Sequence, residues 1–249
     1  MTATLTPRLT ALTPAHSQRI FRTCLDVLAR PGTVGTWAPE WTAAVTRAEA
    51  PVALAPLLAL ADLMAPVAAV PEAAGAGPQA GSQTRAWVQE IARLSGAPLV
   101  DPAGARLALA LGRPDPAALA ELNRSTAAAP HRAALLVQRV TDLGSDLGTA
   151  GTSASGSSAD RTDHAERTDY ADRTDRTEDP VGALVLRLTG PGIADTAQLR
   201  ITGLDREFFT VRDRLVADFP AGIDVLFVTD DCRVAGMPRT TAIRAEEIS

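Results

Sequence analysis

Helix-length amphipathic segments alternate along this chain with short apolar runs of strand length, and this alternation restricts the fold more than any other feature. The first helix begins at Thr13-Pro14, a capping residue followed by a proline suited to the first turn, and ends at Pro31-Gly32. Apolar residues at helical spacing predict further helices at 52–62, 82–94, 116–123 and 205–217, with Ser82 and Asp115 as caps. Strands are expected at 66–70, 106–111, 133–140, 183–188, 198–201, 223–228 and 233–237. The predicted fold class is α/β, with a mixed β-sheet flanked by helices.

Residues 144–180 differ in kind from the rest of the chain. Glycine, serine and threonine give way there to a near-repeat of Arg-Thr-Asp at a step of six residues, and Tyr170 is almost the only large apolar side chain. Such a segment buries too little apolar surface to offset its ordering entropy. We therefore predict one domain over 1–249 with a low-complexity, disordered acidic insert at 144–180, joining two strands that would otherwise form a hairpin. His164 within the insert is weak evidence for a metal, and no metal site is expected.

The insert carries the whole net charge of −5, because it holds nine acidic residues and four arginines. The other positions hold 20 arginines and 20 acids, so we expect neither nucleic acid nor a membrane surface as a partner. All 24 residues counted as lysine or arginine are arginine. The sequence therefore excludes a lysine Schiff base, a lysine general base and a Walker-type lysine on a nucleotide phosphate.

The cysteines and the distribution of apolar residues indicate the cellular compartment in which the protein is expected. Cys24 and Cys232 are the only pair that could form a disulfide, and their spacing matches no metal-binding or redox motif. The N-terminus has no long uncharged apolar run, so we expect no secretory signal and a cytoplasmic protein. The most apolar stretch, 51–70, is interrupted by prolines and an aspartate, which favours a buried helix and strand over a membrane span.

Two segments could contact an anion. In Pro238-Arg239-Thr240-Thr241 the guanidinium of the arginine, which is always positively charged, is followed by two threonine hydroxyls that can also donate hydrogen bonds. This combination suits the binding of phosphate or carboxylate. The alternative is an edge strand whose arginine pairs with Asp224 or Asp230. The turn around Gly190 and Gly192 could present successive backbone N–H groups to an anion, or it could be only a tight turn between strands.

Other polar residues have a functional and a structural interpretation. Arg19 and Arg22 on the first helix could contact a partner protein or an anion, or form a solvated face. His131 at a strand start could act as an acid or base, but no serine or cysteine stands in a recognisable nucleophile elbow beside it. The catalytic residues, if any, are unknown from these patterns.

Several short motifs occur in the same order as in a known family. They are Gln18-Arg19-Ile20-Phe21-Arg22, Ala29-Arg30-Pro31-Gly32, Leu60-Ala61-Asp62, Ala65-Pro66-Val67, Gly96-Ala97-Pro98-Leu99-Val100, the stretch 187–193, the stretch 219–224 and the stretch 237–241. Together they resemble the PhnH family, the H subunit of the carbon–phosphorus lyase system of phosphonate degradation. The chain departs from the family pattern at 124–131, which lacks the usual Gly-Thr pair, and at Leu94-Ser95, where a histidine is expected.

The resemblance implies a fold related to the large domain of PLP-dependent transferases but without PLP, and no other cofactor is expected. It implies a homodimer and/or assembly with the G, I and J subunits into a cytoplasmic core complex. That complex would form alkylphosphonate ribose 5-triphosphate from ATP and an alkylphosphonate, the reaction of alpha-D-ribose 1-methylphosphonate 5-triphosphate synthase. The alternative is a stand-alone α/β enzyme or binding protein that acts on a phosphorylated metabolite.

Overall fold

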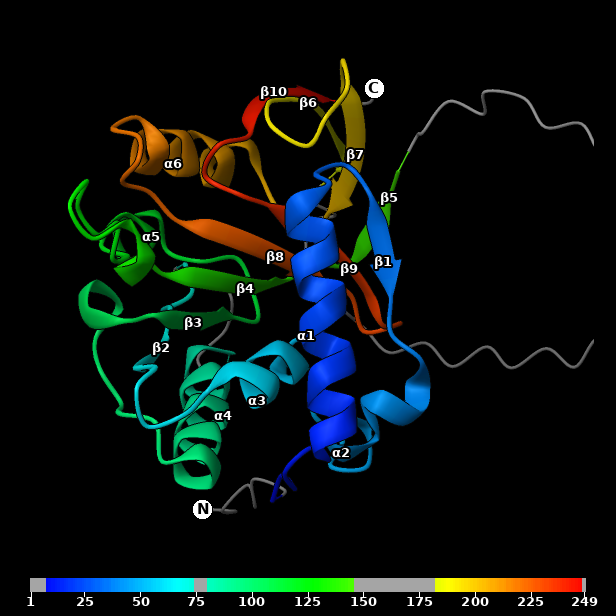
Figure 1. Ribbon diagram of the computed structural model, residues 1–249, viewed down its shortest axis with the longest axis vertical. Helices are drawn as coiled ribbons and strands as arrows, with labels where there is room; N and C mark the ends of the chain where they lie inside the picture. Colours follow the sequence, from blue (N-terminus) through cyan, green and yellow to red (C-terminus); the bar gives the residue numbers. More distant parts are fainter. Residues whose placement is uncertain (1–7, 74–79, 146–181, 248–249) are drawn as a thin grey trace, which may run out of the picture. The chain divides into compact units, whose positions relative to one another are not determined.

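The computed structural model describes residues 8–73, 80–145 and 182–247 (Figure 1). The predicted disorder of the insert lies outside these ranges, apart from its first two residues. Two β-sheets form the framework, and helices α1 (Pro14–Ala29), α3 (Leu54–Leu60) and α4 (Ala80–Ser95) pack on one face of the larger one. Figure 1 shows α1 crossing the front of that sheet.

The larger sheet has six strands in the order β1-β9-β8-β4-β3-β2. Its four neighbouring strands β2, β3, β4 and β8 are parallel, whereas β9 and β1 are antiparallel to their neighbours. The prediction of a mixed sheet flanked by helices is confirmed. The strands are β1 (Val34–Thr36), β2 (Val67–Ala69), β3 (Leu107–Ala110), β4 (Leu135–Arg139), β8 (Asp224–Val228) and β9 (Arg233–Met237).

Both faces of this sheet are buried, which explains why its strands are apolar without alternation. Leu109 and Leu226 pack with α1, α3 and α4, whereas Leu136 and Phe227 point to the other face. There they meet α5 (Pro116–Ala120), α6 (Arg206–Val216) and the second sheet. The core therefore has two layers, one on either side of the larger sheet.

The second sheet is antiparallel, with four strands in the order β10-β6-β7-β5, and the sequence did not predict it as a separate sheet. The strands are β5 (Asp142–Gly144), β6 (Leu184–Thr189), β7 (Ala197–Thr202) and β10 (Ala242–Glu247). The prediction that the strands flanking the insert would pair as a hairpin is wrong. The short turn at 190–196 makes β6 pair with β7, and β5 pairs with the other edge of β7.

Helix boundaries follow local chemistry with one exception. Thr13 accepts a hydrogen bond from the His16 amide, and Asp205 accepts one from the Phe208 amide, so both are N-caps. Ser82 is not a cap, because α4 begins two residues earlier, at Ala80. The remaining short helices are α2 (Ala43–Thr46) and the 3₁₀ turns η1 (Pro39–Trp41), η2 (Pro102–Gly104) and η3 (Pro130–Arg132).

The two cysteines are free and buried, so no disulfide joins them. Burial raises the pKa of the Cys24 thiol to about 12, against a small opposing contribution from a backbone hydrogen bond. Within the described ranges, no helix is long and apolar enough to cross a membrane.

Candidate functional site

Arg239 follows β9, and its guanidinium is held by groups of the chain itself. Nε and Nη2 donate to the two carboxylate oxygens of Asp224 at 3.2 and 2.6 Å. Nη1 donates to the carbonyl oxygens of Pro130 and Pro220 at 3.1 and 3.3 Å. The backbone N–H of Arg239 also donates to Asp224, at 2.8 Å. Only 14% of the Arg239 side chain is exposed, so structural pairing occupies this arginine and the anion contact stays a prediction.

Asp224 is the acid that pairs with Arg239, and the other acid considered from the sequence has its own partner. Asp230 accepts hydrogen bonds from the Nε of Arg139, at 3.1 and 3.0 Å. Asp224 is the first residue of β8, and the other residues of this strand are apolar. It is therefore satisfied by an arginine and by one backbone donor.

Arg212 is a buried arginine that the sequence analysis missed. It lies on α6 with 1% of its surface exposed, and its Nη2 donates to the carbonyl of Pro238 at 2.7 Å. Its Nη1 donates to Asp213 at 3.2 Å, whereas Nε has no hydrogen-bond partner among the described atoms. Burial lowers the pKa of Arg212, opposed by the charges of Asp213 and Asp224. Arg212 and Arg239 thus fix the 238–239 segment from two sides.

One sequence signal could have revealed Arg212. It occurs four residues after Phe208 and three before Leu215, both of which are buried on α6. Helix positions at these spacings share a face. An arginine within an apolar stripe must be paired or hydrogen bonded to be stable.

The structure brings the two predicted anion-binding segments together. A Cβ on Gly190, whose φ is +136°, would lie 2.7 Å from the carbonyl oxygen of Thr240 and 3.4 Å from the Cα of Thr241. The side chain of Thr241 is buried, and its hydroxyl has no partner among the described groups. This contact requires glycine at 190, which gives the turn a packing role whether or not it binds an anion.

Gly192, at the other side of the same turn, packs against the end of α1. Its φ is +84°, and a Cβ there would lie 2.2 Å from the carbonyl oxygen of Ala29. A side chain would also lie 3.1 Å from the ring of Pro31. The β6–β7 turn is thus packed between α1 and the segment that precedes β10, and anion binding by Gly190 and Gly192 stays a prediction.

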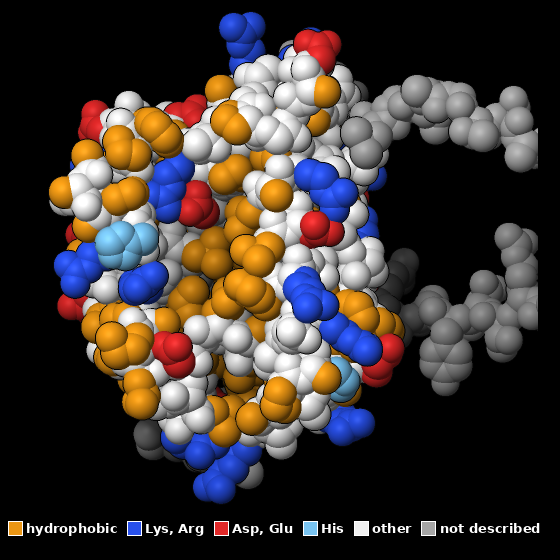
Figure 2. All heavy atoms as spheres, in the orientation of Figure 1, with side chains coloured by type: hydrophobic (Ala, Val, Ile, Leu, Met, Phe, Trp, Pro, Cys, Tyr) orange, Lys and Arg blue, Asp and Glu red, His pale blue; other side chains and the backbone are white. Residues whose placement is uncertain are grey.

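The two predicted contact residues on α1 are Arg19 and Arg22. Arg19 stacks over the Trp41 ring, with its guanidinium carbon 5.3 Å from the ring centroid. Arg22 is exposed beside Phe21 and Leu25, which are 39% and 49% exposed. Figure 2 shows hydrophobic side chains gathered along the middle of this face of the molecule. The role of Arg19 and Arg22 as a partner or anion contact stays a prediction.

The side chain of His131 is exposed in η3. Its carbonyl oxygen accepts a hydrogen bond from Arg106 at 2.9 Å. Among the described residues, no group of three or more histidine, cysteine or acidic side chains could hold a metal ion. The geometry around Arg239 is therefore that of a structural ion pair next to a surface histidine, without an assembled nucleophile and base.

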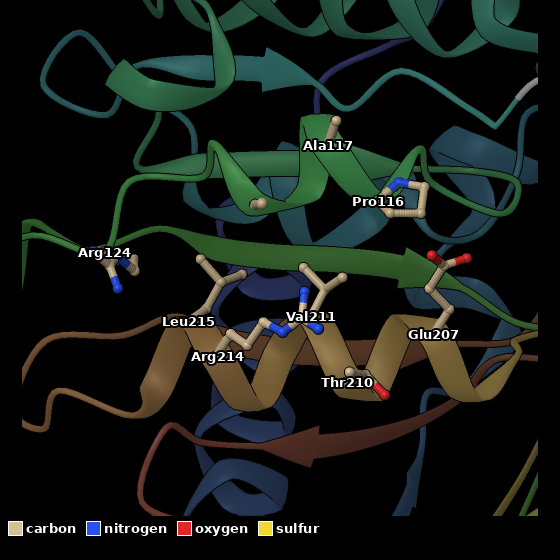
Figure 3. Close-up of a pocket in the computed structure, with 9 residues that line it drawn as sticks. Pro116, Ala117, Arg124, Glu207, Thr210, Val211, Arg214 and Leu215 are labelled. Carbon is tan, nitrogen blue, oxygen red and sulfur yellow. The ribbon is translucent and has the colours of Figure 1, made fainter.

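A pocket of about 700 Å³ lies between α5 and α6, and the sequence analysis did not anticipate it. Its walls are mixed: Pro116, Ala117, Ala120, Val211 and Leu215 are apolar, Thr210 is polar, and the charged residues are Arg124, Glu207 and Arg214 (Figure 3). Arg124 belongs to the loop after α5, which is fixed because its carbonyl accepts a hydrogen bond from the Gly222 amide at 2.9 Å. The pocket is formed by residues distant in sequence, so no local motif marks it.

Comparison with known proteins decides the family. The model of PhnH, described as a bacterial phosphonate metabolism protein, matches residues 11–244, which include every described helix and strand apart from the last residues of β10. This chain belongs to the PhnH family. A protein of Stutzerimonas stutzeri named as the C-P lyase subunit protein HtxG is 43% identical over 58 residues. That match covers 23% of this PhnH chain and 29% of HtxG, so it spans less than a third of the relative.

Proposed function

We propose that this PhnH-family chain is a non-PLP subunit of a carbon–phosphorus lyase core complex. The complex would form alkylphosphonate ribose 5-triphosphate from ATP and an alkylphosphonate during phosphonate catabolism. The family match over residues 11–244 is the observation that carries this proposal. The partial match to a protein named as a C-P lyase subunit supports it.

The geometry favours a contribution to binding and assembly over a self-sufficient active site. Arg239 is engaged by Asp224 and by two carbonyl oxygens. The cysteines are buried and cannot serve as accessible nucleophiles. The proposed kinship with the large domain of PLP-dependent transferases fits a parallel-stranded centre covered on both faces. The absence of lysine from the sequence means that no side chain could hold PLP as an imine.

The proposed partners are a second copy of this chain and/or the G, I and J subunits of the complex, in the cytoplasm. The outer side of α1 supports an assembly role, because Phe21 and Leu25 are one helical turn apart and both are exposed. Arg22 lies between them in sequence and forms no hydrogen bond or ion pair with any described residue. An exposed apolar pair beside a free guanidinium is a composition enriched at protein interfaces.

The test is reconstitution of the transferase step. ATP and methylphosphonate are incubated with the G, I and J subunits, with and without this chain, and adenine release is followed. We expect adenine release to require this chain and the chain to co-purify with its partners. Full release in its absence, or normal growth of a deletion strain on methylphosphonate as sole phosphorus source, would overturn the proposal. Turnover by the purified chain alone would favour the stand-alone alternative.

A pair of variants tests the α1 surface in the same assay. Phe21→Ala combined with Arg22→Ala should weaken co-purification with the other subunits or shift the chain from dimer to monomer. Arg187→Ala, on an exposed position of β6, removes one positive charge elsewhere and serves as the control. Unchanged assembly in the double variant would exclude this surface.

A further inference from the structure

The α5–α6 pocket has the dimensions of a ligand site. Its volume of about 700 Å³ lies within the range of about 300 to 1,000 Å³ that is usual for small-molecule pockets. Val211 and Leu215 form its α6 side, and Pro116, Ala117 and Ala120 form its α5 side. Figure 3 shows Val211 and Leu215 pointing from α6 toward α5. Val211 and Leu215 are buried, so the apolar surface that a ligand can reach is mainly that of Pro116, Ala117 and Ala120.

The positive charge in this pocket is only weakly paired with the acidic residues that the structure describes. Arg214 lines the pocket and makes no hydrogen bond or ion pair with any residue that the structure describes. Arg124 has a single ion pair, at 3.4 Å, with Asp218, an acid that is 76% exposed. Such a long, solvated pair is worth little, so the Arg124 guanidinium can turn to another anion. Two arginine forks in one pocket match the oxygens of a phosphate or phosphonate group.

The opposite end of the pocket is negatively charged. Glu207 lines it there, as Figure 3 shows, and has no ion-pair partner in the described part of the chain. Glu207 and Arg214 are seven residues apart on α6, which corresponds to about 10 Å along the helix axis. A phosphate or methylphosphonate ion would therefore fill only part of the pocket. A larger compound, with an anion at one end and N–H donors at the other, would use all three charged residues.

We propose that the α5–α6 pocket binds a phosphorylated organic compound of about nucleotide size. Its oxyanion contacts Arg124 and Arg214, its body rests against Pro116, Ala117 and Ala120, and its N–H donors face Glu207. This inference concerns the chain alone and stands on the pocket, so it holds or fails independently of the role proposed for the complex.

The test is isothermal titration of the purified full chain with adenosine monophosphate, methylphosphonate and uncharged adenosine as separate probes. We expect the tightest binding for adenosine monophosphate, binding at least tenfold weaker for methylphosphonate, and none measurable for adenosine. Arg214→Gln and Arg124→Gln should each weaken the binding of adenosine monophosphate by about tenfold or more, because each removes a charge-assisted contact. Glu207→Gln should weaken adenosine monophosphate but leave methylphosphonate unchanged.

Arg187→Gln provides the matched control, since it removes the same charge from an exposed strand position outside the pocket. Melting curves of all variants verify folding, which these exposed positions should not disturb. Binding of adenosine monophosphate that is unaffected by both pocket arginine variants would overturn the proposal. So would the lack of any binding at millimolar concentration, or methylphosphonate binding as tightly as adenosine monophosphate. Co-purification with the partner subunits is measured separately and is expected to be unchanged by Arg214→Gln.

Discussion

Replacing Arg239 by glutamine separates its structural role from a role in anion contact. The substitution removes the two-pronged pair with Asp224, whose shorter contact is 2.6 Å, and two donations to carbonyl oxygens. Breaking a fully buried ion pair costs about 3 to 5 kcal/mol. The Arg239 and Asp224 side chains are 14% and 27% exposed, and water therefore reduces this cost. We expect the free energy of unfolding to fall by about 2 to 3 kcal/mol.

The assay is a double-mutant cycle by urea denaturation, with Arg239→Gln, Asp224→Asn and the combined variant. If the two side chains stabilise the fold through each other, the combined variant should lose about 1 to 2 kcal/mol less than the sum of the single losses. For a chain of this length, each single change should lower the melting temperature by about 4 to 12 °C. Arg139→Gln, which removes a more exposed arginine from its pair with Asp230, is the control, and we expect it to cost less than about 1 kcal/mol.

Two results would refute this reasoning. Additive losses, within about 0.5 kcal/mol, would mean that the pair makes no joint contribution. Unchanged stability of Arg239→Gln together with loss of complex activity would mean that the arginine serves an anion and that its pairing with Asp224 is incidental.

Four further predictions concern the fold. Gly192→Ala should lower the free energy of unfolding by about 1 to 3 kcal/mol through its positive φ and backbone clash, whereas Gly182→Ala, with open space around it, should be nearly neutral in the same denaturation assay. Asp205→Ala removes the α6 cap and should cost about 1 kcal/mol, measured by thermal melting. Cys24 and Cys232 should resist a thiol reagent at pH 8 until denaturant is added, and rapid native labelling would contradict their burial. The pKa of Cys24 is raised to about 12 in the folded protein, so the contribution of this thiol to stability is fully present below pH 9 and is lost as the pH rises toward 12. In alkaline denaturation, Cys24→Ala should therefore lose less stability over this pH range than the unmodified chain.

Local chemistry was sufficient for most of the helices and strands. Thr13 and Asp115 were predicted to cap helices, and in the structure each side chain accepts a hydrogen bond from a backbone N–H of the first turn. The continuous apolar runs of β3, β4 and β8 are explained by burial of these strands on both faces of the sheet. These features depend on neighbours in sequence or on hydrophobicity alone, so the sequence predicts them.

Features that depend on long-range pairing were not predictable in the same way. Nothing in the composition of β5 indicates that its partner is β7 and not β6, because each strand alternates buried and exposed positions. The α5–α6 pocket likewise depends on how two helices meet across the sheet. Arg212 was not predicted for a different reason: hydrophobicity alone marks the buried face of α6, and the partner of the guanidinium, the Pro238 carbonyl, is distant in sequence.

The pairing of the second sheet has a consequence for how long the connection between β5 and β6 must be. Gly144 of β5 lies opposite Arg200 of β7, and Leu184 of β6 lies opposite Ile201. The two ends are therefore level with each other on opposite sides of β7, about 10 Å apart at two strand spacings. A two-residue turn cannot join them, since the chain has to cross a whole strand. Shortened versions of this chain should keep their fold only while the connection retains enough residues to cross β7, which sets a minimum length and leaves the maximum open.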